Sequence, residues 1–179
     1  MSLKSKATQV IVCSVTAVLA IVFNIDDELS VSENGLRHIA NEEGCRAKAY
    51  QCSADVWTIG LGHTSGVKQG DKATNEQVAQ YFVKDVATAE KVVKKHITQT
   101  PSQAEYDMMV SFVFNLGAGN FQTSTLLRKF NQGDNLGACK QYPRWVYVNG
   151  KDCRIEESDC PGIPKRRDKE MNICLNGWQ

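Results

Sequence analysis

The sequence predicts an α+β protein with two lobes, and three observations support this prediction. Apolar residues recur at helical spacing from 32 to 40, and an alternating, glycine-punctuated segment follows from 47 to about 67. A long helical pattern then runs from 74 to about 96, and the rest of the chain is mostly helical. With 179 residues and few prolines, the chain has room for one compact domain, or for two small lobes that share a core.

The first predicted element is a short helix that opens an N-terminal lobe at about 30–72. Ser30 or Ser32 is available as its N-cap, and Gly44 ends it. The alternation that follows is typical of a small antiparallel sheet. Because this sheet follows the helix directly, we expect Glu43 to face its concave side.

A linking helix and a mostly helical C-terminal lobe complete the predicted fold. The capping pattern Thr74-Asn75-Glu76-Gln77 opens the linking helix, at about 74–97. The C-terminal lobe, at about 98–179, begins with an apolar helix that starts near Ser102 and ends at Gly117. Its remaining predicted elements are helices at 124–132 and 135–141, a polar loop with Cys153 and Cys160, and a last helix at 164–174.

Composition excludes some functions and indicates a compartment. A formal net charge of +1 argues against nucleic acid as a partner, because that mode of binding needs a concentrated basic surface. The spacing of the cysteines matches no common zinc pattern, and we expect no metal or cofactor. An oxidising compartment fits seven cysteines better than the cytosol, and their odd number leaves at least one thiol free or changing partners: Cys13, Cys45, Cys52, Cys139, Cys153, Cys160 and Cys174.

The N-terminal segment, residues 1–25, contains a short apolar run at 10–23. About 14 residues would span ~21 Å as a helix, which is less than the ~30 Å hydrocarbon core of a bilayer. Lys4 and Lys6 before the run, and three acidic residues after it, favour a cytoplasmic N-terminus with the bulk of the chain outside. Three interpretations remain open: a signal peptide cleaved after Ala20, a permanent anchor, and a weakly held segment that can leave the bilayer.

The predicted helix end and sheet carry an acid, a thiol and a hydroxyl at the spacing Glu-x8-Cys-x5-Thr, formed by Glu43, Cys52 and Thr58. Glycoside hydrolysis needs an acid for the leaving oxygen and a second group that acts as base or nucleophile. Each residue also has an ordinary interpretation: an exposed glutamate at a helix end, a half-cystine, and a threonine that packs in a strand. Asp55 is the nearest carboxylate that could replace the thiol as base, although it suits a tight turn better.

The chain resembles the phage-type lysozymes, glycoside hydrolase family 24. The resemblance covers nearly everything after residue 30, and the catalytic pattern of that family is Glu-x8-Asp/Cys-x5-Thr. It implies a lysozyme-like fold that binds peptidoglycan and no cofactor. The segments that carry it are Glu43-Gly44, Tyr50, Trp57 to His63, Phe82-x-x-Asp85-Val86, Val113 to Gly117, Arg144-Trp145, and Gly162 to Glu170.

The resemblance also implies roles for single residues. Glu43 would be the general acid, Thr58 would help to place the attacking water, and Cys52 stands where many relatives have aspartate. A thiolate there could act as base or as nucleophile, and these alternatives predict opposite anomeric outcomes. By the same resemblance, Phe114 lines the sugar cleft, Arg166 lies against the catalytic glutamate, and His63 pairs structurally with Asp85.

Three cysteines resemble those of the signal-arrest-release (SAR) endolysins, a subset of the family exported in a tethered, inactive form. The resemblance implies a disulfide between Cys45 and Cys52 that cages the catalytic thiol. When the segment leaves the membrane, Cys13 would attack Cys45 and release Cys52 by thiol exchange, without an outside reductant. The ordinary alternative is that Cys13 is a small apolar residue in a signal peptide.

The other four cysteines allow three pairings. We expect Cys153 with Cys160, which closes a short local loop, and Cys139 with Cys174, which joins two helices of the C-terminal lobe.

Together these observations predict a muramidase that cuts the β-1,4 bond between N-acetylmuramic acid and N-acetylglucosamine and lyses the host cell. Its expected partners are peptidoglycan, the host inner membrane through residues 8–23, and the host export and thiol-oxidation machinery, and we expect a monomer. It would be held first in the inner membrane and then released into the periplasm. The alternatives are a secreted lysozyme with a cleaved signal peptide, a non-catalytic peptidoglycan-binding module and, least favoured, a pore-forming lysis protein.

Overall fold

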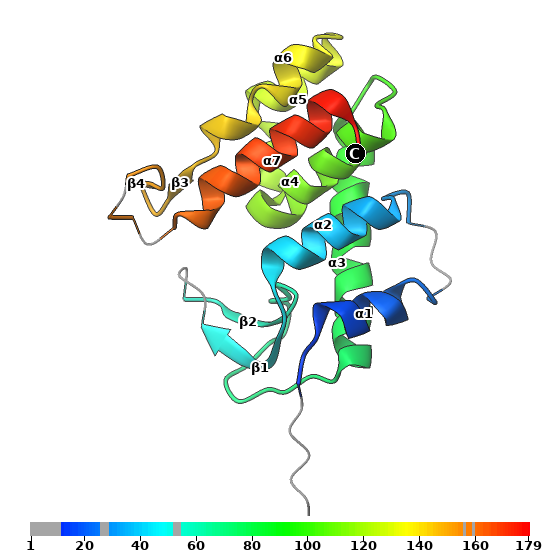
Figure 1. Cartoon of the computed structure of the whole chain (residues 1–179), viewed down its shortest axis with the longest axis vertical. Helices are drawn as coiled ribbons and strands as arrows, with labels where there is room; N and C mark the ends of the chain where they lie inside the picture. The colour runs from blue at the N-terminus through cyan, green and yellow to red at the C-terminus, as the bar shows by residue number, and fades with distance from the viewer. Residues whose placement is uncertain (1–11, 26–28, 52–54, 156, 159) are drawn as a thin grey trace, which may run out of the picture.

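The computed structural model describes residues 12–25, 29–51, 55–155, 157–158 and 160–179 (Figure 1). The described part is an α+β structure in which α3 runs from a small N-terminal lobe to a larger helical lobe. The elements are, in chain order, α1 Val15–Val22, α2 Glu33–Glu43, β1 Arg46–Gln51, β2 Trp57–Gly60, α3 Asn75–His96, α4 Gln103–Gln122, α5 Thr125–Asn131, α6 Asn135–Cys139, the 3-10 turn η1 Tyr142–Arg144, β3 Tyr147–Val148, β4 Lys151–Asp152 and α7 Gly162–Asn176.

Helix α2 leads directly into the hairpin of β1 and β2. The N-cap is Ser32, whose hydroxyl accepts a hydrogen bond from the Gly35 amide, and the helix ends at Gly44 with a φ of 67°. A positive φ costs glycine little, so the chain can turn sharply there into β1. Strands β1 and β2 pair antiparallel, with Tyr50 opposite Thr58. The predicted helix and small sheet are confirmed.

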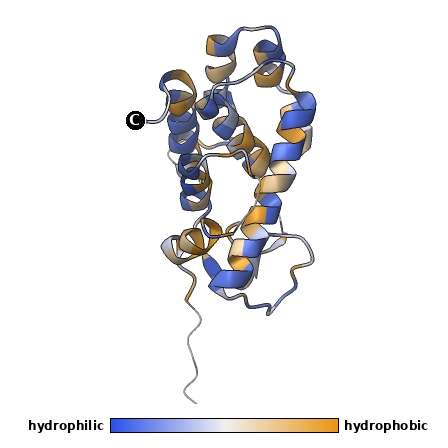
Figure 2. Ribbon diagram, turned by 90° about the vertical axis from the view of Figure 1, so that its right-hand side faces the viewer, coloured by the Kyte–Doolittle hydropathy of each residue, from blue (hydrophilic) through white to orange (hydrophobic). Residues whose placement is uncertain are grey.

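Helix α3 joins the two lobes. Thr74 and Gln77 form the expected capping box at its N-terminus. At 22 residues the helix is ~33 Å long, enough to reach from one lobe to the other. Hydrophilic and hydrophobic residues alternate along the helix (Figure 2). Its buried side chains recur at helical spacing and include Val78, Phe82, Val86 and Val93.

Helix α4 passes the point at which the sequence predicted its end. It starts after the capping box of Ser102 and Glu105, as expected, but it continues to Gln122. Gly117 interrupts the helical backbone with a φ of 83°. The helix resumes because the fully buried Phe121 packs the next turn into the core. The expected end at Gly117 is therefore a kink.

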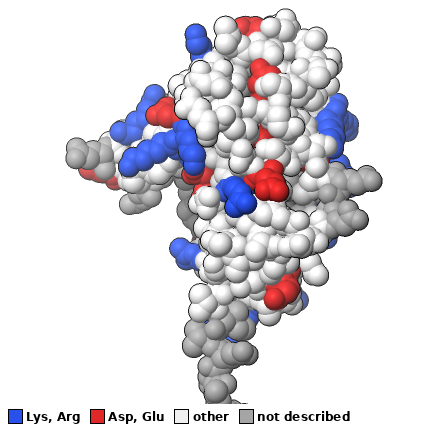
Figure 3. Space-filling model, turned by 45° about the vertical axis from the view of Figure 1, so that its right-hand side comes forward, with Lys and Arg blue, Asp and Glu red and all other residues white. Residues whose placement is uncertain are grey.

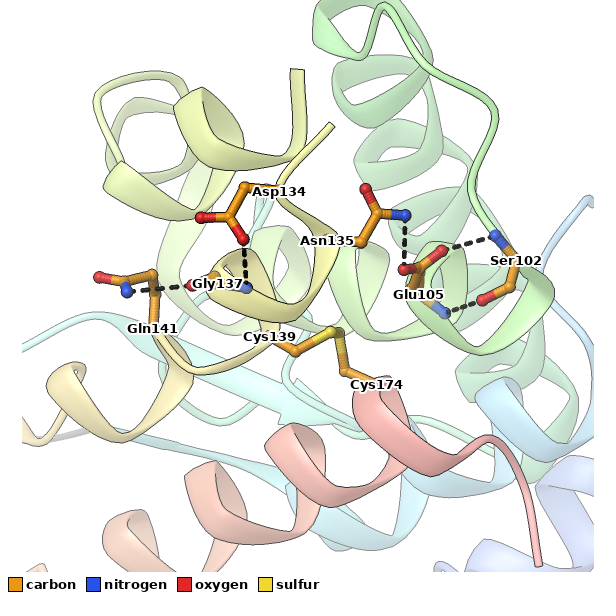
Figure 4. The surroundings of a disulfide bond; sticks show 8 residues. All are labelled: Ser102, Glu105, Asp134, Asn135, Gly137, Cys139, Gln141 and Cys174. Carbon is orange, nitrogen blue, oxygen red and sulfur yellow. Dashed lines mark hydrogen bonds between the residues drawn. A yellow bond between two sulfur atoms is a disulfide. The ribbon is translucent and has the colours of Figure 1, made fainter. Parts of the chain in front are cut away.

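Helices α5 to α7 complete the C-terminal lobe, and two disulfides tie it together. Cys139 of α6 is bonded to Cys174 of α7 (Figure 4), and Cys153 is bonded to Cys160. Both bonds coincide with the expected pairings. Beside the first, Asn135 donates a hydrogen bond to Glu105, which connects α6 to the start of α4.

The segment expected to be a polar loop contains a small hairpin. Strands β3 and β4 pair antiparallel, with Tyr147 opposite Asp152. Asn149 and Gly150 form the turn between them, with φ values of 50° and 77°. An Asn-Gly pair with two positive φ values is the preferred two-residue hairpin turn, so the sequence did carry a signal for this element.

Helix α1 packs on the N-terminal lobe. Val18, Leu19 and Val22 are buried, and the helix contacts α3 and α2. Just before it, Cys13 forms a disulfide with Cys45, which precedes β1. Within the described ranges, the structure has no helix that is both long enough and apolar enough to cross a membrane.

Charged residues occupy only part of the face in Figure 3. On the face in Figure 3 most of the described atoms belong to uncharged residues. Several basic side chains lie together on the projection at the left, and other acidic and basic side chains are scattered over the face. This distribution agrees with the net charge of +1.

Candidate active site

Glu43 is the last residue of α2, where the N-terminal lobe meets the C-terminal lobe. Its side chain is 17% exposed, so the carboxylate is accessible but largely enclosed. Gly62 lies directly against it, because a Cβ built on Gly62 would be 3.2 Å from Glu43 Oε2. The missing side chain at position 62 leaves room in front of the carboxylate.

Arg166 of α7 forms an ion pair with Glu43. The distance from Arg166 Nη1 to Glu43 Oε1 is 2.8 Å, and the arginine side chain is only 5% exposed. Burial opposes the charged guanidinium, but Glu43 and Glu170 outweigh it and raise the pKa of Arg166. The arginine is therefore a permanent cation beside the expected acid, as the resemblance implied.

A second carboxylate, Glu170, lies behind this pair and was missed from the sequence. It is fully buried and accepts hydrogen bonds from Ser111 Oγ at 2.8 Å and from Arg166 Nε at 3.1 Å. Arg167 Nη1 is 3.1 Å from its other oxygen, and His38 Nε2 is 3.6 Å away. Burial opposes its ionisation, but these neighbours outweigh it and lower the pKa of Glu170.

Phe114 of α4 lines a cavity of about 250 Å³ next to the acid. Its ring packs edge-on against Phe82 of α3, with centroids 5.8 Å apart. A Cβ on Gly62 would lie 3.6 Å from Phe114, which places the cavity beside the site of Glu43. Its lining includes Gly62, Asp85 and Gly117. This position agrees with the expected role of Phe114 in the sugar cleft.

The other two residues of the catalytic pattern follow on the hairpin. Thr58 is buried on β2, and its hydroxyl donates a hydrogen bond to the Val56 carbonyl at 3.1 Å. Asp55 has a φ of 58°, which suits the turn position expected for it. Cys52 directly follows β1 in the sequence and lies outside the described residues.

His63 and Asp85 form the expected structural pair in the N-terminal lobe. His63 Nδ1 lies 2.7 Å from Asp85 Oδ2, and the imidazole stacks on Tyr81 with centroids 4.3 Å apart. The stacking contact had no signal in the sequence pattern. Both contacts join the loop after β2 to α3. Among the residues that the structure describes, no three His, Cys, Asp or Glu residues gather as metal ligands would.

Similarity to known proteins identifies the family of this chain. The family model for phage lysozyme matches residues 40–170, which include Glu43, Phe114 and Arg166. The chain belongs to the phage lysozyme family. It is therefore a muramidase, a glycoside hydrolase.

Relatives of this phage lysozyme include two endolysins. The endolysin of Acyrthosiphon pisum secondary endosymbiont phage 1 is 41% identical over 147 residues, which cover 81% of this chain and 97% of the relative. The SAR-endolysin of Escherichia phage P1 is 31% identical over 179 residues, with 93% of this chain and 92% of the relative covered.

Two crystal structures of the P1 phage endolysin Lyz match to different degrees. The active form has a TM-score of 0.81 at 29% identity and covers 93% of this chain and 96% of its own. The secreted inactive form, also at 29% identity, has a TM-score of 0.56 and covers 82% and 96%. The structure of this lysozyme is thus more similar to the active form.

Proposed function

We propose that this phage lysozyme is an endolysin that hydrolyses the β-1,4 bond between N-acetylmuramic acid and N-acetylglucosamine, with Glu43 as the general acid. The observation that carries the proposal is the position of Glu43 between the Arg166 guanidinium and the cavity lined by Phe114. A proton on Glu43 would pass to the glycosidic oxygen as that bond breaks.

Cys52 would supply the second group. As a base, its thiolate would take a proton from a water that Thr58 helps to place, and the product would have inverted configuration. As a nucleophile, it would form a covalent glycosyl intermediate that water then hydrolyses with retention. The family resemblance favours inversion, because many relatives have an aspartate at this position.

Export and activation would use the N-terminal segment. In the proposed cycle residues 8–23 hold the protein in the host inner membrane while a Cys45–Cys52 bond, made by the host thiol-oxidation machinery, blocks the thiol. After release into the periplasm, the Cys13 thiolate attacks the Cys45 sulfur, and Cys52 leaves as thiolate. One disulfide replaces another, so no oxidant or reductant is consumed.

Three findings support this cycle. The bond in the structure is Cys13–Cys45, which is the expected product of the exchange. Relatives are named SAR-endolysins, and the fold is more similar to the active form of one of them. Cleavage after Ala20 would also remove Cys13 together with the buried Val18 and Leu19, so the packing of α1 favours a segment that is retained.

The acid assignment is tested by Glu43→Gln, measured by loss of turbidity of purified peptidoglycan. We expect activity to fall to background, because the amide has the same shape but cannot donate the proton. Glu42→Gln is the matched control, since Glu42 is the neighbouring residue and pairs with the exposed Lys169. Activity retained in Glu43→Gln would refute the assignment.

The exchange is tested by two cysteine variants with opposite expected results. Cys13→Ser should give released protein that is inactive, with Cys45 and Cys52 still bonded in a non-reducing peptide map. Cys45→Ser should be active even before release, because Cys52 has lost its caging partner. Full activity of released Cys13→Ser would remove Cys13 from the mechanism.

A further inference from the structure

The charged cluster behind Glu43 carries a role that the catalytic pattern does not assign. Glu170 is fully buried on α7, one helical turn after Arg166, and a buried carboxylate is costly unless it is paired and hydrogen-bonded. Its partners come from three helices that meet at the site: α2 with His38, α4 with Ser111, and α7 with its two arginines.

Arg166 stands between two carboxylates and uses different edges of its guanidinium for each. Nη1 donates to Glu43 at 2.8 Å, while Nε donates to Glu170 at 3.1 Å. The guanidinium is planar, so fixing Nε on Glu170 also fixes the direction in which Nη1 points. The contact with Glu170 therefore orients the arginine toward the acid.

The two contacts also share the positive charge of Arg166 between Glu43 and Glu170. With Glu170 present, the positive charge of Arg166 faces two anions. With a neutral residue at position 170, Arg166 would be a buried cation that has Glu43 as its nearest anion. That environment would favour ionised Glu43, and an ionised carboxylate cannot act as the acid.

Other charged groups lie near Glu170 and contribute to the pH dependence of the site. Arg167 also contacts Glu170 and donates a hydrogen bond to Asn115 of α4. Helix α2 presents His38 to Glu170, and Glu42 lies 4.0 Å from the other nitrogen of that ring. Lys169 of α7 pairs with Glu42 at the surface. Tyr142 of η1 is fully buried, and burial and the nearby Glu170 raise its pKa well above the ordinary value.

We propose that Glu170 is a positioning residue that acts through Arg166: it takes up part of the positive charge of the guanidinium that lies against Glu43, so that Glu43 can carry the catalytic proton. The inference rests on the proposed role of Glu43 as the acid. It assigns to Glu170 an effect on catalysis in addition to its part in the packing of α7.

The test is Glu170→Gln in the full-length released protein, with kcat and KM measured on purified peptidoglycan across pH. The amide keeps the shape of the side chain but removes its charge. In a plot of kcat against pH, the alkaline limb is the fall in kcat at high pH. We expect this limb to move to a pH lower by about one unit, so that kcat at pH values above the limb is roughly ten-fold lower, while KM changes little. Ser111→Ala is the matched control, because it removes the hydrogen bonds of Ser111 to Glu170 and, at 3.5 Å, to Arg166 Nη2 but keeps both charges, and its limb should stay in place.

A double variant tests whether Glu170 acts through the arginine. In an Arg166→Met background, adding Glu170→Gln should not move the limb further. If the limb of folded Glu170→Gln equals that of the wild type, or if the shift persists without Arg166, the inference is overturned. Should Glu170→Gln not fold by near-ultraviolet circular dichroism, Glu170→Asp takes its place, with a smaller shift of the same sign expected and an unchanged limb overturning the inference. An active Glu43→Gln would instead refute the proposed function itself.

Discussion

The two disulfides of the C-terminal lobe should contribute unequally to stability, and their loop lengths set the difference. Cys139 and Cys174 are separated by 35 residues, and Cys153 and Cys160 by 7. When a disulfide constrains the unfolded chain, the longer loop corresponds to about 4 kcal/mol and the shorter to about 2 kcal/mol. Because 35/7 is 5, the expected difference is (3/2)RT ln 5, about 1.4 kcal/mol, and the constant term cancels.

The experiment compares two double variants, Cys139→Ala/Cys174→Ala and Cys153→Ala/Cys160→Ala, by thermal unfolding of released protein. Both leave the Cys13–Cys45 bond in place. The midpoint of thermal unfolding should fall by about 8–16 °C for the first and about 4–8 °C for the second. An equal or larger loss from the Cys153–Cys160 pair would refute the argument from loop length.

Two substitutions and an acid titration test other contacts of the structure. Leu19→Ala should lower the free energy of unfolding of the released enzyme by about 2–5 kcal/mol in urea unfolding, because its side chain is buried where α1 packs. Phe114→Leu keeps an apolar side chain but loses the flat ring, so kcat/KM on peptidoglycan should fall roughly ten-fold, mainly through KM. The lowered pKa of Glu170 stabilises the fold above its ordinary value near 4.5, and this contribution is lost as the pH falls through the lowered value. Acid titration should therefore destabilise the wild type more steeply than Glu170→Gln.

Local signals were enough to predict most of the fold. Ser32, and the pair Thr74 and Gln77, mark helix starts because their side chains satisfy free amides, and this chemistry needs only neighbouring residues. The overrun of α4 past Gly117 could not be predicted in this way, because the burial of Phe121 depends on distant parts of the chain.

In the site, too, local patterns predicted some residues and missed those that depend on packing between distant parts of the chain. Glu43 and Thr58 lie within one short pattern, and a resemblance to a known family was needed to connect Arg166 to them. Glu170 was missed because an arginine and a glutamate four residues apart on a helix usually form an exposed pair. The packing of α2, α4 and α7 buries this pair, and that packing cannot be read from spacing within α7.

The proposed cage has a consequence for the backbone as well as for the thiol. Strand β1 has 6 residues between Cys45 and Cys52, which corresponds to roughly 20 Å of extended chain. A disulfide requires its two Cα atoms to lie within about 7 Å. A Cys45–Cys52 bond and an extended β1 therefore exclude each other, whereas the Cys13–Cys45 bond leaves β1 free to pair with β2, where Thr58 lies opposite Tyr50. In the proposed cycle, the exchange would thus release the thiol and allow the hairpin of the active site to form in the same step.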